Sequence, residues 1–362
     1  MIIAIDGSRA FLKQRTGIEE YSYQVIKHLR DKLDGHQVVL YVRKNQKVDF
    51  EMPGNWKIKT IRWPRFWTQL GLSLEMLLRP ADVLFVPAHT VPWIHPKKTV
   101  VVVHGLEYEI MPQAYSKWGR LYMRCSIRNS CRWAEKVVSV SRNTKQDLVR
   151  LYGIPEDKIQ VVYEGYDLEN SKSVPDGGNS DFQKYKPFLL FVGRLEERKN
   201  IVGIIKAFEI LKEKHGVPHK LLLAGGNGYG FPAIGYLIEN SKYKDDIIRL
   251  GFVPDEKKFE LISQADIFMF PTFYEGFGIP VLEAQSVGVP VIASNTSSIP
   301  EVAGDSAVLV DPDEAWYIAE RTYELISDRE YRGDMVKRGY ENVKRFGWDG
   351  CAEKISDILK EK

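Results

Sequence analysis

Residues 267–283 read Ile-Phe-Met-Phe-Pro-Thr-Phe-Tyr-Glu-Gly-Phe-Gly-Ile-Pro-Val-Leu-Glu. The first four residues form a short apolar run typical of a buried strand, and a turn with two glycines follows. Pro280 suits the first turn of a helix, because an N–H there would have no intrahelical partner. The stretch therefore predicts a strand, a tight turn and a helix in succession, which is the repeating unit of a parallel sheet covered by helices.

The same alternation runs through both halves of the chain and favours an α/β protein. In the first half, strands are predicted at Ile2–Asp6, Gln37–Val42, Val83–Val86, Thr99–His104 and Lys136–Val140, and helices at Gly17–Leu33, Gln69–Leu78, Ala114–Ala134 and Asn143–Tyr152. In the second half, strands are predicted at Phe188–Val192, Lys220–Ala224, Ile247–Leu250, Ile267–Phe270, Pro290–Ala293 and Ala307–Val310, and helices at Ile201–Lys214, Asp255–Ser263, Pro280–Ser286 and Asp313–Ile326.

Between the two halves lies a polar, glycine- and serine-rich segment without periodicity, which predicts a linker at residues 169–186. A chain of 362 residues is also long enough for two domains. We therefore expect two doubly wound, Rossmann-like domains, 1–168 and 187–345, that face a central cleft. Residues 346–362 are expected to form a C-terminal helix that packs back on the first domain. Ligands of open α/β sheets bind beyond the carboxyl ends of the strands, so site residues are sought there.

Composition excludes several classes of protein. Hydrophobic residues make up 44% of the chain and charged residues 27%, as in globular domains. No apolar run approaches the roughly 20 residues that span a bilayer, and the first residues lack signal-peptide features, so a cytoplasmic protein is expected. A net charge of +3 is too small to indicate nucleic acid, and no nucleic-acid partner is expected. The 3 cysteines have no metal-ligand spacing, which predicts reduced thiols.

A second motif, Val192-Gly-Arg-Leu-Glu-Glu-Arg-Lys-Asn200, follows the first strand of the second domain. A strand end, a glycine and two cations before a helix suit phosphate binding. Arg194 can grip phosphate through its planar fork, and Lys199 can act as a point charge. The alternative is a charged helix start whose cations pair with Glu196 and Glu197.

Two carboxylates flank the turn at 271–279: Glu275 lies within it and Glu283 one turn into the next helix. Carboxylates accept paired hydrogen bonds from vicinal hydroxyls, which sugars and riboses offer. The free N–H groups of a helix start favour an anionic or hydroxyl-rich ligand. The alternative is a tight strand-to-helix turn with two solvated glutamates. In the first domain, His104 ends an apolar strand and is expected to face the cleft, unless it has a structural role.

Glu275 and Glu283 form an E-x7-E motif, and together with Arg194 and the pair Lys199-Asn200 they resemble the retaining glycosyltransferases of family 4, which have the GT-B fold. The resemblance covers nearly the whole chain and is densest between Phe188 and Pro312. It implies that Arg194 and Lys199 hold the diphosphate of a nucleotide-sugar donor and stabilise it as it leaves. Arg198 departs from the family pattern, which has a single lysine in this segment.

The resemblance also implies roles for the other candidates. Glu275 and the backbone of the following turn would position the sugar, and Glu283 would hold the ribose. His104 would contact the sugar or the leaving oxygen, although Gly105 stands where relatives often have an aspartate. The remaining donor-binding candidates are backbone positions: Gly17, Val253, Gly276, Phe277, Gly278 and Ile279. Two cations on the phosphates make a metal dispensable, so no metal and no cofactor are expected.

These features imply transfer of a hexosyl group, with mannosyl favoured, from a GDP- or UDP-sugar to a hydroxyl of a glycan or lipid-linked oligosaccharide, with retention of anomeric configuration. The segments 224–226 and 298–304 look most like those of mannosyl- or rhamnosyltransferases of surface-polysaccharide synthesis. The alternatives are a nucleotide-sugar epimerase or hydrolase of the same fold and a non-catalytic nucleotide-sugar-binding protein.

One feature points to a membrane surface. Arg120, Arg124, Arg128 and Arg132 recur every fourth residue among aromatic and aliphatic residues, and no acidic residue lies between 110 and 134. Such a helix can lie on anionic lipid headgroups, which predicts peripheral association with the inner face of the plasma membrane. The segment 63–67, Trp-Pro-Arg-Phe-Trp, would add an apolar anchor. The alternative is a solvated basic face over an ordinary core.

Overall fold

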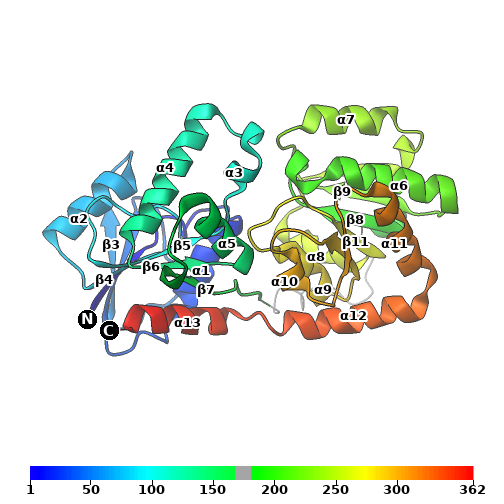
Figure 1. The fold of residues 1–362 in the computed structure, drawn as a ribbon. Helices are drawn as coiled ribbons and strands as arrows, with labels where there is room; N and C mark the ends of the chain where they lie inside the picture. Colours follow the sequence, from blue (N-terminus) through cyan, green and yellow to red (C-terminus); the bar gives the residue numbers. More distant parts are fainter. Residues whose placement is uncertain (168–180, 362) are drawn as a thin grey trace. The chain divides into compact units, whose positions relative to one another are not determined.

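The structure, a computed structural model, describes residues 1–167 and 181–361 and divides into two compact units (Figure 1). One unit comprises Met1–Gly165 together with Phe346–Lys362, and the other comprises Tyr166–Arg345. Of the predicted linker at 169–186, residues 169–180 lie outside the described residues. The cleft expected between the units stays a prediction.

The first unit is built on a parallel sheet of 7 strands in the order β3-β2-β1-β4-β5-β6-β7. Its strands are β1 (Ile2–Asp6), β2 (Gln37–Arg43), β3 (Trp56–Ile61), β4 (Val83–Val86), β5 (Lys98–Val103), β6 (Lys136–Ser139) and β7 (Ile159–Val161). Its helices are α1 (Gly17–Leu29), the π-helical turn η1 (Trp67–Leu72), α2 (Ser73–Leu78), α3 (Glu107–Ile110), α4 (Lys117–Trp133), α5 (Arg142–Tyr152) and α13 (Trp348–Lys360). The central strand β4 is buried throughout, as expected for a strand with helices on both faces of its sheet.

The second unit contains a parallel sheet of 6 strands in the order β10-β9-β8-β11-β12-β13. Its strands are β8 (Phe188–Val192), β9 (Lys220–Ala224), β10 (Ile247–Gly251), β11 (Ile267–Phe270), β12 (Val291–Ser294) and β13 (Val308–Val310). Its helices are α6 (Ile201–His215), α7 (Phe231–Asn240), α8 (Asp255–Ser263), α9 (Ile279–Ser286), α10 (Ile299–Ala303), α11 (Ala315–Ser327) and α12 (Arg329–Val343). The two doubly wound units confirm the predicted α/β class.

Every predicted strand is present, with ends shifted by at most one residue. The elements that were not predicted include the strands β3 and β7 and the helices α3, α7 and α10. In β3 lysines interrupt the apolar pattern, because the strand lies at the sheet edge, where charged residues are favoured. The predicted helix at 114–134 begins only at Lys117, because the hydroxyl of Ser116 accepts the N–H of Gly119 at 3.1 Å and caps it.

The predicted apolar anchor at 63–67 is wrong in part. Trp67 is only 2% exposed, and its indole N–H donates to the carbonyl of Ile61 at 3.3 Å. The π-helical turn η1 begins at Trp67 and directs this side chain into the core. Trp63 and Phe66 are exposed, at 41% and 69%, so only these two aromatic residues of the segment face solvent.

The helix α13 completes the first unit. It packs on α1, and the ring of Trp348 meets the ring of Tyr21 edge-on at 5.8 Å. A Cβ on Gly165 would lie 2.4 Å from the Trp348 side chain, so glycine allows the close approach there. The hydroxyl of Ser356 donates to the carbonyl of Lys32 at 2.9 Å.

In both sheets the strand order reverses direction once, between β1 and β4 in the first unit and between β8 and β11 in the second. Chain connections leave such a point on opposite faces of the sheet, which opens a crevice beyond the carboxyl ends of the two strands. The loop after β8 carries Arg194 and Lys199, and the loop after β11 carries Glu275. These three predicted donor residues therefore lie in the loops at the switch point.

The loops after β8 and β9 pack closely against each other, and this packing depends on Gly225, which follows β9. Its φ is 147°, and a Cβ there would lie 1.9 Å from the carbonyl oxygen of Gly193. The neighbouring Gly226 has no atom within 4 Å of its own Cβ position. Only the first of these two glycines is thus required by the fold.

We expect Gly225→Ala to lower the free energy of unfolding by about 2–4 kcal/mol, because it adds both backbone strain and a clash. Chemical denaturation followed by circular dichroism measures the change. Gly226→Ala is the matched control and should change stability by less than about 0.5 kcal/mol. Equal stability of the two variants would show that the loops do not approach this closely.

Candidate functional site

The loops after β8 and β11 are joined to each other. The N–H of Phe273 donates to the carbonyl of Arg198 at 3.0 Å. Asn200 has a left-handed backbone with a φ of 56°, and its side-chain oxygen caps α6. Its Nδ2 donates to the carbonyls of Pro271 at 3.0 Å and Pro312 at 2.6 Å. The position of each loop is therefore set by the other.

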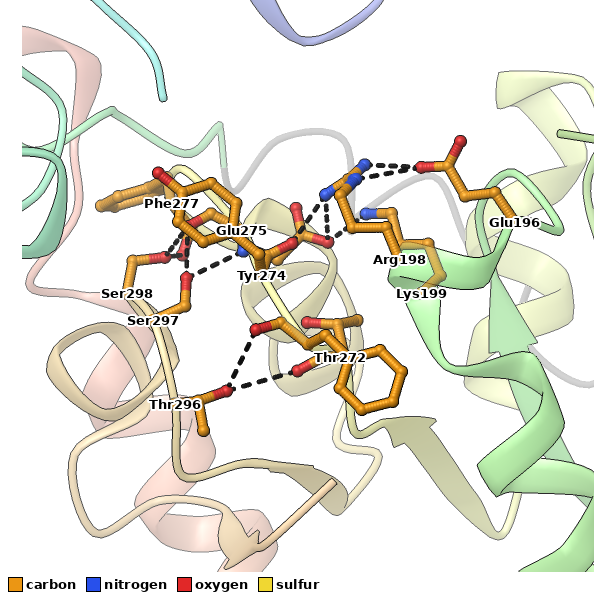
Figure 2. A network of polar contacts seen from close by, with 11 residues as sticks. Glu196, Arg198, Lys199, Thr272, Tyr274, Glu275, Phe277, Thr296, Ser297 and Ser298 are labelled. Atoms are coloured by element: carbon orange, nitrogen blue, oxygen red, sulfur yellow. Dashed lines mark hydrogen bonds and ion pairs between the residues drawn. The ribbon is translucent and has the colours of Figure 1, made fainter. Parts of the chain in front are cut away.

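These loops bring together a cluster of buried charges (Figure 2). Lys199 and Glu275 form an ion pair through Nζ and Oε1, and each residue is 9% exposed. Nη1 of Arg198 lies 3.2 Å from the same carboxylate oxygen and donates to the carbonyl of Tyr274 at 2.7 Å. Nη2 of Arg198 donates to Oε1 of Glu196 at 2.7 Å. The alternative of local pairing with Glu196 thus describes one contact of Arg198, but both Arg198 and Lys199 also reach Glu275 in the loop after β11.

Burial and charge act in opposite directions on this cluster. Burial lowers the pKa of Lys199, although Glu275 opposes the shift. Burial alone would raise the pKa of Glu275, but the charges and hydrogen bonds of Lys199 and Arg198 outweigh it, and the pKa is lowered. The Glu275 carboxylate is therefore ionised at neutral pH.

Two serines after β12 fix the turn that carries Glu275 (Figure 2). The Ser297 hydroxyl accepts the N–H of Glu275 at 2.8 Å and donates to its carbonyl at 2.5 Å. The Ser298 hydroxyl donates to the carbonyl of Phe277 at 2.6 Å. Gly278 has a φ of 120°, which side chains rarely allow, and α9 begins at the next residue. The backbone of 276–279 is thus held in one conformation.

Glu283 lies on α9 and is paired with a residue of α8. Nζ of Lys258 donates to its Oε1 at 2.7 Å, and the side chains are 20% and 12% exposed, respectively. The carboxylate predicted to hold a ribose therefore has a cationic partner that fixes its position.

Arg194 and Val253 differ in their surroundings. Arg194 is exposed, and among the described residues no carboxylate forms an ion pair with it; its aliphatic stem lies against Gly228. Val253 packs its side chain against the core of the second unit, whereas its neighbour Phe252 is 76% exposed. A ligand would therefore meet the side chain of Arg194, whereas the side chain of Val253 is partly buried against the core.

The other two predicted residues, His104 and Gly17, belong to the first unit. Nε2 of His104 lies 2.9 Å from the carbonyl oxygen of Pro87, and Nδ1 lies 3.2 Å from Oε1 of Glu164. Tyr21 meets the imidazole edge-on at 4.6 Å. Both ring nitrogens therefore already have protein partners. Gly17 is exposed at the start of α1, where its backbone is open to a ligand.

A second histidine near His104 was not predicted. The pKa of His89 is lowered to about 4, mainly by burial, with the charges of His104 and Arg9 acting in the same direction. His89 follows β4, and Arg9 follows β1, so both stand beyond the switch point of the first sheet. In the sequence, His89 is a single histidine after a short predicted strand. Such a histidine is by itself only a weak indication of a functional site.

Sequence reasoning also missed the partners of the predicted residues: Lys258, Glu164, Ser297 and Ser298. Each is distant along the chain from the residue it contacts; Glu164, for example, lies 60 residues after His104. The available signals were the position of Ser297 and Ser298 after a predicted strand and, for Ser298, the family resemblance of the segment 298–304. Among the described residues, no group of three or more His, Cys, Asp or Glu side chains could hold a metal.

Comparison with known proteins identifies the family. A model described as Glycosyltransferase Family 4 matches residues 15–170, and one described as Glycosyl transferases group 1 matches residues 178–342. The O-antigen chain mannosyltransferase B of Escherichia coli is 31% identical over 268 residues, which cover 73% of this chain and 70% of that protein. The chain belongs to the glycosyltransferase family that these two models describe. It is therefore an enzyme, and the predicted family membership is confirmed.

Other relatives of this glycosyltransferase are more distant. The O-antigen chain mannosyltransferase RfbU of Salmonella typhimurium is 22% identical, with 96% of this chain and 97% of that protein covered. Among solved structures, the lipopolysaccharide glycosyltransferase WaaG has a TM-score of 0.73 at 17% identity, with 99% of this chain and 100% of that chain covered. HepE of Anabaena, in complex with UDP and glucose, has a TM-score of 0.72 at 16% identity, with both chains fully covered at 100%. These likenesses show the fold, and the GT-B prediction is confirmed.

The buried ion pair of this glycosyltransferase predicts strong coupling in a double-mutant cycle. Lys199→Met and Glu275→Gln should each lower the free energy of unfolding by about 3 kcal/mol, because each leaves a buried charge without a full partner. The double variant should be more stable than the sum of the two changes predicts, by at least about 1 kcal/mol. Denaturant titration measures all four proteins.

The control cycle uses Lys242 and Glu213, whose side chains lie 3.2 Å apart at 77% and 66% exposure. Their coupling should be close to zero, because solvent screens exposed pairs. Additive effects at Lys199 and Glu275 would contradict the buried pair.

His89 predicts a pH dependence of stability. Because its pKa is about 4 in the folded protein against an ordinary value of 6.5, the unfolded chain takes up the proton first as the pH falls. The free energy of unfolding should thus decrease by roughly 2–3 kcal/mol between pH 6.5 and pH 4 from this group. Denaturant titrations of His89→Gln across this range should show a correspondingly smaller decrease. An unchanged pH profile in the variant would contradict the assignment.

Proposed function

We propose that this glycosyltransferase moves a hexosyl group, with mannosyl favoured, from a GDP- or UDP-sugar to a hydroxyl of a glycan or lipid-linked oligosaccharide, with retention of anomeric configuration. The observation that carries the proposal is the buried Lys199–Glu275 ion pair beyond the switch point of the second sheet. It places a cation and an ionised carboxylate together, where a diphosphate and a sugar hydroxyl each need one.

In the proposed reaction the bond between the anomeric carbon and the donor phosphate oxygen breaks, and its electron pair leaves with the diphosphate. Arg194 and Lys199 neutralise the charge that develops there. The acceptor hydroxyl attacks the anomeric carbon from the face that the diphosphate leaves, and its proton passes to the departing phosphate oxygen. No carboxylate is assigned as a nucleophile, so the protein acts by positioning and by charge stabilisation.

The remaining residues position the donor. Lys199 and Arg198 both meet Oε1 of Glu275, so Oε2 is the oxygen assigned to a sugar hydroxyl. Glu283 is assigned to the ribose, with Lys258 orienting its carboxylate. The backbone of Gly276, Phe277, Gly278 and Ile279 contacts the sugar, and Gly17 and Val253 contribute backbone contacts.

His104 is assigned to the sugar or the leaving oxygen. Because Pro87 and Glu164 occupy its nitrogens, a bond to the donor requires one of these partners to be exchanged.

The donor and acceptor classes are supported by relatives. Two similar proteins are named as O-antigen mannosyltransferases, which favours a mannosyl donor and a glycan acceptor. A solved structure of similar fold was determined with UDP and glucose.

No helix among the described residues combines the length and apolar character needed to cross a membrane. A cytoplasmic location at the inner membrane face is part of the proposal.

The donor assignment is tested by Arg194→Ala. We expect donor turnover to fall by about 10²–10³-fold, because a charge-stabilising donor to the leaving group is lost. Arg329→Ala, at an exposed position on α12, is the control and should retain wild-type turnover. Thermal-shift screening with UDP-, GDP-, dTDP- and ADP-sugars selects the donor for this assay. Wild-type turnover by Arg194→Ala would overturn the scheme.

The product of the reaction distinguishes the proposed transferase from a hydrolase, an epimerase or a binding protein. Nuclear magnetic resonance of the anomeric proton should show a glycoside with the configuration of the donor. Free or epimerised sugar without a glycoside would instead indicate a hydrolase or epimerase. Donor binding without turnover, in the presence of candidate acceptors, would indicate a binding protein.

A further inference from the structure

The exposed apolar side chains are concentrated in one part of the first unit. More than half of the large hydrophobic residues that are exposed among those described fall between residues 63 and 133. They include Trp118 at 82%, Tyr122 at 61% and Leu121 at 50% on α4, and Trp93 at 61% in the loop after β4. Groups of exposed large apolar side chains mark interaction surfaces in soluble proteins.

The elements that carry these side chains lie side by side. The N–H of Val91 donates to the Ser130 hydroxyl of α4 at 2.9 Å. Three residues later, the N–H of Ile94 donates to the Ser73 hydroxyl of α2 at 3.2 Å. The loop with Trp93 thus bridges α4 and α2, which are both labelled in Figure 1. On α2, Leu74, Leu77 and Leu78 extend the apolar surface, with exposures of 42%, 60% and 66%.

Helix α4 has one buried face and one exposed face. Ile127 and Cys131 are buried, whereas Trp118, Tyr122 and Cys125 are exposed and lie one above the other at helical spacing. Leu121, Arg128 and Arg132 line the adjacent edge of the exposed face, since they stand at intervals of seven and four residues.

The charge of this region is strongly positive. Residues 62–133 contain 10 Arg and Lys but only 4 Asp and Glu. Glu109 binds two of the four predicted arginines, with Nη2 of Arg120 at 3.1 Å and Nη2 of Arg124 at 2.5 Å. Arg128 and Arg132 are exposed, and neither forms an ion pair with a described residue. The basic surface therefore centres on these last two arginines.

We propose that Trp93, Trp118, Leu121, Tyr122, Arg128 and Arg132 form a lipid-binding face that holds the protein on an anionic phospholipid bilayer. The arginines meet the phosphate groups, and the aromatic and leucine side chains enter the headgroup region. Exposed leucines on both α2 and α4 favour a bilayer over nucleic acid, which would leave these aliphatic side chains in contact with water. The proposal requires neither a donor nor an acceptor, so its test is independent of the proposed reaction.

The first experiment is co-sedimentation of the full chain with vesicles at physiological ionic strength. Vesicles of phosphatidylcholine with added phosphatidylglycerol should sediment the protein, and those of phosphatidylcholine alone should bind it at least about tenfold more weakly. Arg128→Glu/Arg132→Glu should weaken binding to the anionic vesicles by about tenfold or more. Trp118→Ala/Tyr122→Ala should also weaken it, and high salt should rescue neither variant.

Matched controls come from exposed positions of the second unit. Trp316 and Tyr317 on α11 are 55% and 41% exposed, so Trp316→Ala/Tyr317→Ala removes comparable aromatic surface. Arg329→Glu/Lys337→Glu on α12 makes the same change in net charge as the arginine variant. Both controls should bind vesicles like the wild type. All variants should retain donor turnover on a water-soluble acceptor, which separates loss of membrane binding from loss of activity.

The chain provides its own probe for the orientation. Cys125 is exposed on α4, whereas Cys131 and Cys351 are buried, so a thiol-reactive, polarity-sensitive dye should label Cys125 selectively. Its emission should shift to shorter wavelength with anionic vesicles and remain unchanged with neutral ones. No sedimentation with anionic vesicles, full binding by the arginine variant, or sedimentation without a dye shift would each overturn the proposal. Binding of single-stranded RNA in place of vesicles would also overturn it.

Discussion

Lys199 and Glu275 are 76 residues apart in sequence and come from loops that follow two adjacent strands. Taking both charges out of water is costly, and their attraction offsets the cost only when geometry and hydrogen bonding are good. The surrounding structure supplies both: Asn200 joins the two loops, Arg198 shares the carboxylate oxygen, and Ser297 holds the backbone of Glu275. Much of the loop structure around the switch point can be understood as the support that this pair requires.

The pair also explains which parts of the site were predictable. Strands such as β8 and β11 are continuous apolar runs, and each is followed by a glycine and charged residues, so their positions and the presence of a polar site after them follow from local sequence. The partner of each charged side chain, however, does not follow from local sequence. Arg198 and Lys199 are adjacent and both reach Glu275, yet only Arg198 also pairs with Glu196.

The same limit applies to the fold. The strand β3 was missed because its lysines suit an edge position that only the completed sheet defines. Trp67 reads as a surface aromatic in sequence, but the π-helical turn that begins there directs it inward. The partners of His104 could not be inferred either, since Pro87 and Glu164 follow other strands of the sheet. For β3 and His104 a non-local contact decided the outcome, and for Trp67 a rare helical turn did.

The return of α13 to the first unit has a consequence for how the protein is made. The ribosome synthesises residues 1–165 first, then the whole of the second unit, and only afterwards the helix that covers Tyr21 and Gly165. Domains usually fold in the order of their synthesis. The first unit must instead wait with part of its core uncovered while the second unit emerges and folds. The burial of apolar surface in the first unit is therefore completed last, although most of this unit is synthesised first.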